Sequence, residues 1–227
     1  MHNIFYSNYI INSRDCNYLR SKDYLYVRQE ADEIVICCCV ATLYLWREFL
    51  MFIETEHLVL RKFQEDDFND FCEYAMDDEM CRMMGRKLMH SREDARWNFD
   101  WLKDKEERCY GLVYKDTGRI IGNLTVCAVP TELLELEKLK GKVGKSMSFS
   151  ISKNYQRKGL MLEAVNAVVK HLFDIEGMDY IQCGHFPFNT ASEMLQKKLG
   201  FKYLTTLRFD DEGIEIISIE NILWKGR

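Results

Sequence analysis

The segment from Ser146 to Asp174 constrains the fold of this chain more than any other part of its sequence. Met147, Phe149 and Ile151 alternate with serines, which is the period of a strand with one buried face. A polar loop follows, and beyond Gly159 the apolar residues recur at helical spacing. The pattern therefore predicts a strand, a short loop and an amphipathic helix in immediate succession.

The loop between this strand and helix is a candidate anion site. The expected helix has an apolar stripe of Met161, Val165, Val168 and Leu172 and a polar face of Glu163, Asn166, Lys170 and Asp174. Its first turn directs unpaired N–H groups and the positive end of the helix dipole to one point, which suits a pyrophosphate. Arg157 and Lys158 add positive charge. A glycine needed only for turn geometry is the alternative, because neither the nucleotide-binding P-loop spacing nor G-x-G-x-x-G is present.

From Met51 onward the pattern predicts one mixed α/β domain. Strands are expected at about 55–63, 109–114 and 119–127, a helix beginning at 65–67, a capped helix beginning at Ser91 and a helix with a loop at 131–145. Trp97 and Trp101 lie one turn apart in the capped helix, and we expect both in the core.

Residues 1–50 differ in kind from the rest. The apolar run at 34–46 is interrupted by Arg47 and Glu48. A membrane-spanning helix needs about 20 predominantly apolar residues, and central charges are costly. We therefore expect a poorly packed or peripheral extension before the domain at 51–227 and no membrane association, with a membrane or partner anchor as the alternative.

Charge and cysteine usage narrow the function classes. The formal net charge is −5 and no dense Lys/Arg tract occurs, which argues against a nucleic-acid partner and suits a cationic one. The nine cysteines include no C-x-x-C pair, so neither a zinc site nor a disulfide framework is expected. They are interpreted as small buried hydrophobes in a reducing compartment, which indicates a cytoplasmic protein.

Three motifs in order carry a resemblance to a known family. Residues 53–224 resemble the GNAT superfamily of N-acetyltransferases, in particular its RimJ/RimL-like branch. Ile53–Asp67 is similar to that branch's first strand and helix start, and Gln156–Met161 is similar to its [RQ]-x-x-G-x-[GA] acetyl-CoA loop. Asn189–Ser192, followed by Leu199–Phe201, is similar to its later helix and the strand after it.

Two positions of the loop depart from the family pattern. Arg157 stands where a glycine is usual, and Met161 stands where Gly or Ala is usual. A methionine is tolerated at 161 if its side chain points into the core, but it narrows the pyrophosphate cradle if it faces the cofactor.

The resemblance implies an α+β fold of the GNAT type. Its mixed, mostly antiparallel sheet carries helices on both faces, and the fourth and fifth strands, here about 146–152 and 179–184, splay apart around the pantetheine arm of acetyl-CoA. It implies acetyl transfer to an amine, either a protein N-terminus or a small molecule, by a monomer or homodimer without a metal. The cofactor-binding residues it implies are Ser150, Ile151, Gln156, Arg157, Lys158, Gly159, Leu160, Met161, Asn189 and Ser192.

Catalytic roles carried over from the family have ordinary alternatives. Ser192 is the expected acid that protonates the leaving thiolate, or else an ordinary helix serine. Tyr203 is the alternative acid, or a core residue. Asn189 is expected to cap its helix and to contact the cofactor arm.

The base is not identified by sequence, and a water-mediated route is also open. The candidates are Glu132, Glu135, Asp210, Asp211, Glu215 and His185. A non-catalytic acyl-CoA-binding sensor or interaction module of the same fold is the alternative function.

Overall fold

The computed structural model describes residues 27–30, 33–36, 52–104, 108–211 and 214–226. The chain divides into two units, residues 1–50 and 51–227. Of the first unit, the structure describes an antiparallel pair, β1 (Val27–Glu30) and β2 (Glu33–Ile36). The apolar run beyond Ile36, on which the anchor alternative rests, lies outside the described residues. No helix within the described ranges is both long enough and apolar enough to cross a bilayer.

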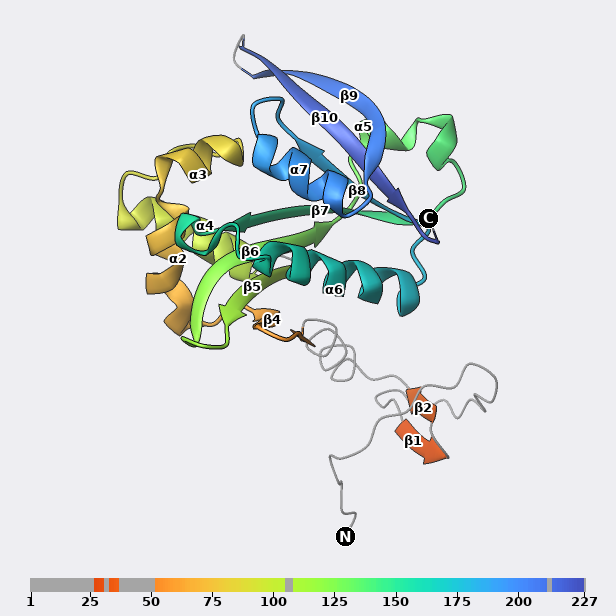
Figure 1. Cartoon of the computed structure of the whole chain (residues 1–227), viewed down its shortest axis with the longest axis horizontal. Helices are drawn as coiled ribbons and strands as arrows, with labels where there is room; N and C mark the ends of the chain where they lie inside the picture. Colours follow the sequence, from red (N-terminus) through yellow and green to blue (C-terminus); the bar gives the residue numbers. More distant parts are fainter. Residues whose placement is uncertain (1–26, 31–32, 37–51, 105–107, 212–213, 227) are drawn as a thin grey trace, which may run out of the picture. The chain divides into compact units, whose positions relative to one another are not determined.

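The second unit is built on an eight-stranded sheet of order β3-β4-β5-β6-β7-β8-β10-β9 (Figure 1). Its strands are β3 (Ile53–Glu54), β4 (Leu58–Lys62), β5 (Arg108–Tyr114), β6 (Arg119–Cys127), β7 (Gly144–Ile151), β8 (Tyr180–His185), β9 (Lys202–Asp211) and β10 (Ile214–Trp224). Neighbouring strands pair antiparallel except β7 and β8, which are parallel. The predicted α+β fold with a mixed, mostly antiparallel sheet is confirmed.

Helices cover both faces of this sheet (Figure 1). They are α2 (Phe68–Ala75), α3 (Asp78–Met83), α4 (Arg92–Asp104), α5 (Thr131–Leu134), α6 (Leu160–Asp174) and α7 (Thr190–Lys198), with short 3-10 turns at 65–67, 137–139 and 153–155. One hydrophobic cluster joins α2 and α4 to one face, and a second joins α6 to the other. Leu195 and Leu199 bring α7 against the second cluster.

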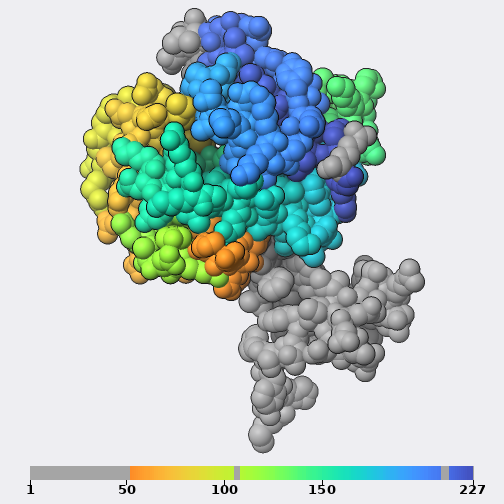
Figure 2. Space-filling view, viewed as in Figure 1, coloured from red at the N-terminus to blue at the C-terminus, as the bar shows by residue number. Residues whose placement is uncertain are grey.

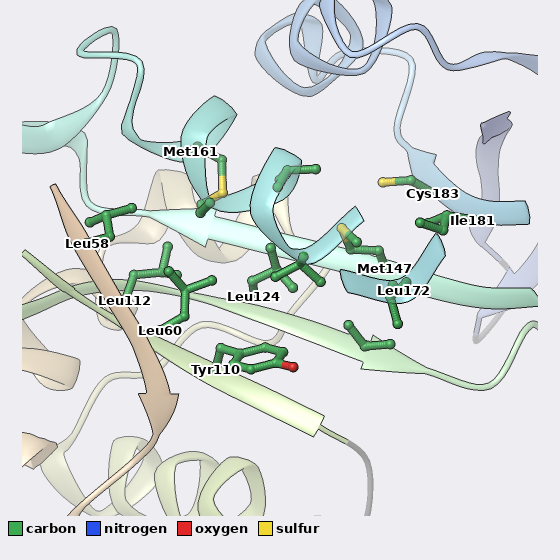
Figure 3. Packing of buried hydrophobic residues seen from close by; sticks show 14 of the residues in the cluster. Leu58, Leu60, Tyr110, Leu112, Leu124, Met147, Met161, Leu172, Ile181 and Cys183 are labelled. Atoms are coloured by element: carbon green, nitrogen blue, oxygen red, sulfur yellow. The ribbon is translucent and has the colours of Figure 1, made fainter. Parts of the chain in front are cut away.

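The apolar stripe predicted for the helix at 160–174 is the centre of the core. Met161, Val165, Val168 and Leu172 are all buried against β4–β8 (Figure 3). Met161 is 7% exposed and belongs to the core cluster around α6. This burial favours the arrangement in which a methionine is tolerated at 161, and the role of residue 161 toward the cofactor stays a prediction.

Helix α4 begins as predicted but buries a different face. Ser91 Oγ accepts from the amide of Asp94 at 3.1 Å, and the Asp94 carboxylate accepts from the amide of Ser91 at 2.9 Å, which is a reciprocal cap. The side chains buried by α4 are Ala95, Phe99 and Leu102. Trp97 and Trp101 lie on the other side of the helix, 71% and 47% exposed, so the prediction that they belong to the core is wrong.

Three other elements differ from the sequence expectation. The first strand is divided, because the amide of Thr55 donates to the carbonyl of Leu58 at 2.9 Å in a turn between β3 and β4. The helix expected at 131–145 is only a short turn of helix, and β7 already begins at Gly144. The long β9–β10 hairpin was not predicted from its sequence.

A partly buried ion pair fixes the C-terminal end of α6 to β5. Arg108 donates from both terminal guanidinium nitrogens to Glu176, with Nη2 at 2.6 Å from Oε2. His171 Nε2 lies 3.1 Å from Glu176 Oε1. Burial raises the pKa of Glu176, but the hydrogen bonds from His171 and Arg108 outweigh it and bring that pKa to about 2.

The Glu176→Gln variant is expected to lower the free energy of unfolding by about 2 kcal/mol at pH 7, since it removes a charged hydrogen-bond partner from Arg108. A carboxylate with a depressed pKa stabilises the fold at pH values above its ordinary pKa of 4.5. This contribution is lost as the pH falls toward the depressed pKa of about 2. Urea unfolding of both proteins at pH 7 and pH 3 measures this. An equal difference at the two pH values contradicts the assignment.

Candidate active site

The central feature of the site is a gap between two neighbouring strands. The residue pairs that join β7 to β8 are Gly144↔Tyr180, Lys145↔Ile181 and Ser146↔Gln182. Beyond Ser146 the two strands run on without pairing each other, β7 to Ile151 and β8 to His185. The predicted splaying of the fourth and fifth strands of the family's sheet is therefore present, at β7 and β8.

The register of β7 decides which of its backbone groups face this gap. The amide of Ser152 donates to the carbonyl of Ile121 on β6 at 2.8 Å. Because orientation alternates along a strand, Ser150 also pairs with β6, opposite Asn123, whereas Phe149 and Ile151 turn the other way. Of the two implied cofactor-binding residues on this strand, Ile151 thus has its amide facing the gap and Ser150 does not.

Ser150 contributes its side chain to a buried polar cluster instead. Its hydroxyl donates to Asn123 Oδ1 at 2.7 Å, and the hydroxyl of Tyr74 donates to the same oxygen at 3.2 Å. Asn123 is fully buried. This cluster fixes β6, β7 and α2 to one another beside the gap.

The loop from β7 to α6 has two residues in the left-handed backbone region. Gly159, the N-cap of α6, has φ +82°, and Arg157 has φ +62°. Arg157 therefore keeps the backbone conformation for which glycine is usual at this place, despite its side chain. Gln156 Nε2 donates to the carbonyl of Ile151 at 3.3 Å, which joins the loop to the end of β7.

This loop, the candidate anion cradle, is exposed at the surface. Residues 156–159 are exposed, and Figure 2 shows the loop at the surface on the same side of the molecule as α7. A Cβ placed on Gly159 would meet no other atom within 4 Å, so the space in front of the helix is open. Lys158 Nζ lies 5.0 Å from the centre of the Tyr155 ring, and the first-turn N–H groups of α6 point outward.

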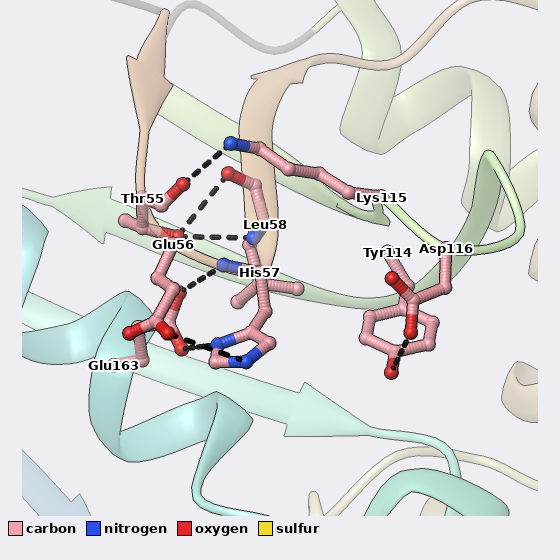
Figure 4. Close-up of polar contacts among 8 residues, drawn as sticks. All are labelled: Thr55, Glu56, His57, Leu58, Tyr114, Lys115, Asp116 and Glu163. Carbon is pink, nitrogen blue, oxygen red and sulfur yellow. Dashed lines mark hydrogen bonds and ion pairs between the residues drawn. The ribbon is translucent and has the colours of Figure 1, made fainter.

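The first turn of α6 is held by a contact that the sequence gave no sign of (Figure 4). Glu163 accepts from the amide of His57 at 2.8 Å and lies 2.9 Å from His57 Nδ1. Burial raises the pKa of Glu163, but hydrogen bonds from Thr55 and His57 outweigh it, so the pKa is lowered. An ionised carboxylate in a first turn complements the helix dipole, and here it also anchors the helix to the start of β4.

Asn189 and Ser192 lie at the start of α7, on the other side of the gap. Asn189 Oδ1 accepts from the amide of Ser192 at 3.0 Å, so the predicted N-cap is present. Asn189 Nδ2 donates to the carbonyl of Met83 at 3.0 Å, which ties α7 to α3. A role of Asn189 toward the cofactor stays a prediction.

The hydroxyl of Ser192 is oriented by a buried amide. Gln196 Nε2 donates to Ser192 Oγ at 3.0 Å and to the carbonyl of Gly184 at 3.3 Å, and Gln196 Oε1 accepts from Asn221 at 2.8 Å. Because Ser192 Oγ accepts from Gln196, its own hydrogen is directed elsewhere. The arrangement suits a proton donor, which is the role expected for Ser192.

Tyr203 lies apart from this arrangement. It is 64% exposed on the edge strand β9, and its hydroxyl lies 3.0 Å from Thr206 Oγ1. The expectation that it packs in the core is wrong, and its role as the alternative acid stays a prediction.

The acidic base candidates with described side chains are exposed, and the structure does not gather them at the gap. Glu132, Glu135 and Asp210 lie at the surface, and Glu215 pairs with Arg208 at 2.8 Å. The side chain of Asp211 lies outside the described residues. His185 is buried, with Nδ1 3.1 Å from the carbonyl of Phe186. Among the described residues, no group of His, Cys, Asp and Glu has a metal-binding arrangement.

Two buried polar side chains next to the gap were not predicted from the sequence. Gln182 is 2% exposed on β8, and Glu220 is 5% exposed on β10. Gln182 Nε2 donates to Glu220 Oε2. The one signal in the sequence is that Glu220 is a single carboxylate within the mostly apolar run 216–224. In an ordinary hairpin such a residue lies on the solvated face, so its burial was not expected.

Comparisons with known proteins show the family of this chain. Residues 57–202 match the family model described as acetyltransferase (GNAT) domain. The uncharacterized N-acetyltransferase p20 of Bacillus licheniformis is 24% identical over 164 residues, covering 70% of this chain and 83% of that protein. The uncharacterized N-acetyltransferase YoaA of Bacillus subtilis (strain 168) is 26% identical over 160 residues, covering 69% and 85%.

Solved structures share the fold at low identity. A GNAT-family acetyltransferase from Bacillus anthracis has a TM-score of 0.67 and 18% identity, covering 78% of this chain and 100% of that chain. The ribosomal-protein-S5-alanine acetyltransferase from Vibrio fischeri has a TM-score of 0.57 and 19% identity, covering 77% and 97%.

Proposed function

This chain belongs to the GNAT acetyltransferase family and is an N-acetyltransferase, and we propose that it takes the acetyl group from acetyl-CoA and passes it directly to a primary amine. The observation that carries the proposal is the gap between β7 and β8, which opens at Ser146 and ends at the cradle around Gly159. A linear cofactor arm with a pyrophosphate at one end fits such a gap.

The residues present fit acetyl-CoA at each part of this path. The open space at Gly159, the outward N–H groups of α6 and the side chains of Arg157 and Lys158 suit the pyrophosphate. Leu160 and Met161 are buried, so any contact with the cofactor comes from their backbone amides. The amides of Phe149 and Ile151 face the gap and can hydrogen-bond the arm and the acetyl carbonyl.

The chemistry asked of the protein is modest, because a thioester is already activated. The amide of Ile151 stabilises the oxyanion of the tetrahedral intermediate, and the hydroxyl of Ser192 protonates the leaving thiolate. The gap fixes both reactants in one place, which contributes by proximity.

The acceptor that we propose is a protein N-terminus, with a small amine as the alternative. The RimJ/RimL-like motifs support the N-terminus, and the similar Vibrio fischeri enzyme is named for the alanine of a ribosomal protein. The non-catalytic alternative rests on Arg157, on Met161 and on the absence of an identified base, and the burial of Met161 in the core weakens one of these three grounds. A cytoplasmic location, expected from the cysteines, belongs to the same proposal, and the number of subunits stays at monomer or homodimer.

Calorimetric titration of the full chain with acetyl-CoA, and separately with CoA, tests the cofactor. Dissociation constants in the micromolar range are expected for both. Thiol release is then measured with spermidine and with a peptide that has a free N-terminal alanine. Absence of binding by a protein with a cooperative unfolding transition overturns the proposed function.

A further inference from the structure

Glu220 is a buried carboxylate with an unusual environment. It pairs with Gly184 across β8 and β10, and a Cβ on Gly184 would lie 2.6 Å from Glu220 Oε2, so the carboxylate lies directly over the glycine. The register of β10 with β9 shifts between Glu220 and Asn221, where Leu204 is the extra residue on β9, so the sheet is irregular directly beside the carboxylate. No Lys or Arg within the described ranges forms an ion pair with Glu220. A carboxylate is rarely buried this deeply without one.

Gln182 places a second acceptor beside it. Since Gln182 Nε2 donates to Glu220, Gln182 Oε1 points away from the carboxylate. That oxygen is buried and has no hydrogen-bond partner in the described part of the chain. Buried polar atoms are nearly always satisfied, so a donor is called for at this position. Two adjacent acceptors, one of them charged, match a group with several N–H donors and a positive charge.

The location of the pair relative to the gap follows from the register. Ser146↔Gln182 is the last pair before β7 and β8 separate, and paired residues share a face of the sheet. Ser146, Ser148, Gln182, Gly184 and Glu220 therefore lie on one face. Ile181 and Cys183, which alternate with Gln182 and Gly184, pack with α6 and α7 on the other. Ser192 and Glu220 thus lie on opposite faces of β8.

We propose that this polar face binds the acceptor as a primary ammonium, with Glu220 as its counter-ion and the group that takes its proton, and with Gln182 Oε1 accepting a further N–H. The inference rests on the proposed N-acetyl transfer and assigns its acceptor site. Approach from this face sets the amine and the Ser192 hydroxyl on opposite sides of the thioester carbon.

The step balances as follows. The ammonium loses one proton to the Glu220 carboxylate, and the free amine attacks the acetyl carbonyl. The C–N bond forms, the C–S bond breaks, and the thiolate takes the proton of Ser192. The second nitrogen proton restores the Ser192 hydroxyl through water, and Glu220 releases its proton to solvent. The sum is an ammonium and a thioester giving an amide, a thiol and one proton.

The environment of Glu220 also suits a base. Burial raises its pKa, and hydrogen bonds from Ser218 and Gln182 and the nearby His185 offset only part of this rise. A carboxylate with a raised pKa accepts a proton more readily at neutral pH.

The Glu220→Gln variant tests the assignment, since it keeps the shape and removes the charge. With spermidine and the alanine peptide as acceptors, kcat/KM for the amine is expected to fall by about 100-fold or more. The affinity for acetyl-CoA in calorimetry is expected to stay within about twofold. Glu137→Gln, at an exposed carboxylate paired with Lys140, is the control and is expected to leave both unchanged.

A second variant keeps the proposal falsifiable if Glu220→Gln fails to fold. Gln182→Met keeps a similar side-chain volume but removes the acceptor oxygen Oε1. The factor by which KM for the amine rises is expected to be about 10 times the factor by which kcat changes. If the wild type transfers acetyl groups and the Glu220→Gln variant has the same kinetics, this inference alone is overturned. Absence of acetyl-CoA binding or of thiol release by the wild type overturns the proposed function, and this inference with it.

Discussion

A valine at position 159 is expected to weaken acetyl-CoA binding by about 100-fold, equivalent to roughly 2.7 kcal/mol. Gly159 has φ +82°, where a β-branched residue is strained by about 1–3 kcal/mol. Its Cβ meets nothing in the protein itself, so the added atoms occupy the space that a pyrophosphate must approach. Calorimetric titration of the Gly159→Val variant with acetyl-CoA measures the loss.

The matched control is Gly177→Val, at the far end of α6. Gly177 has φ +69° and equally open surroundings, so a valine there brings similar backbone strain without lying at the cradle. The two variants are expected to lose comparable stability in thermal unfolding, whereas only Gly159→Val loses affinity. Equal affinities for the two variants refute the pyrophosphate site.

Ser192→Ala is expected to lower kcat by about 100-fold, toward the lower end of what general acids contribute, because a thiolate is a good leaving group. Its affinity for acetyl-CoA is expected to change less than threefold, since the hydroxyl acts mainly as the C–S bond breaks. Steady-state thiol release and calorimetry on the same preparation separate the two effects.

Two companion variants make the assignment specific. Ser192→Thr retains a hydroxyl that can accept from Gln196, and partial recovery of kcat is expected. Tyr203→Phe removes the alternative acid on the edge strand, and little change is expected because Tyr203 is largely exposed there. A large loss with Tyr203→Phe and none with Ser192→Ala reverses the two roles.

The sequence predicted best where one local pattern settles one element. The stripe of Met161, Val165, Val168 and Leu172 needs only helical spacing to be read, and the core contains all four. The same holds for the cap of α4 and for the strand alternation before Gly159. The tryptophans of α4 were misplaced because two large apolar residues one turn apart look like a buried stripe, while Ala95 and Phe99 define the one that packs.

The candidate site was predicted only in part, because its geometry depends on pairing between distant segments. Arg157 replaces the glycine of the family pattern, yet its backbone has φ +62°, which the residue type alone does not predict. Glu220 and Gln182 meet because β10 pairs with β8 in one particular register. A shift of one residue would turn Glu220 to the other face, so its importance is a property of the sheet and not of its own neighbours in sequence.

The short pairing between β7 and β8 divides the sheet into two groups of strands. Strands β3–β7 form one group, and β8, β10 and β9 form another. Within the sheet, the two groups are joined by the three residue pairs between β7 and β8. The apolar face of α6 belongs to one hydrophobic cluster with Leu124 and Met147 of the first group and with Ile181 and Cys183 of the second. The core side chains of α6 thus bridge the two groups of strands, and a change in their volume is expected to change the width of the gap between β7 and β8, even though these side chains lie away from the proposed reacting groups.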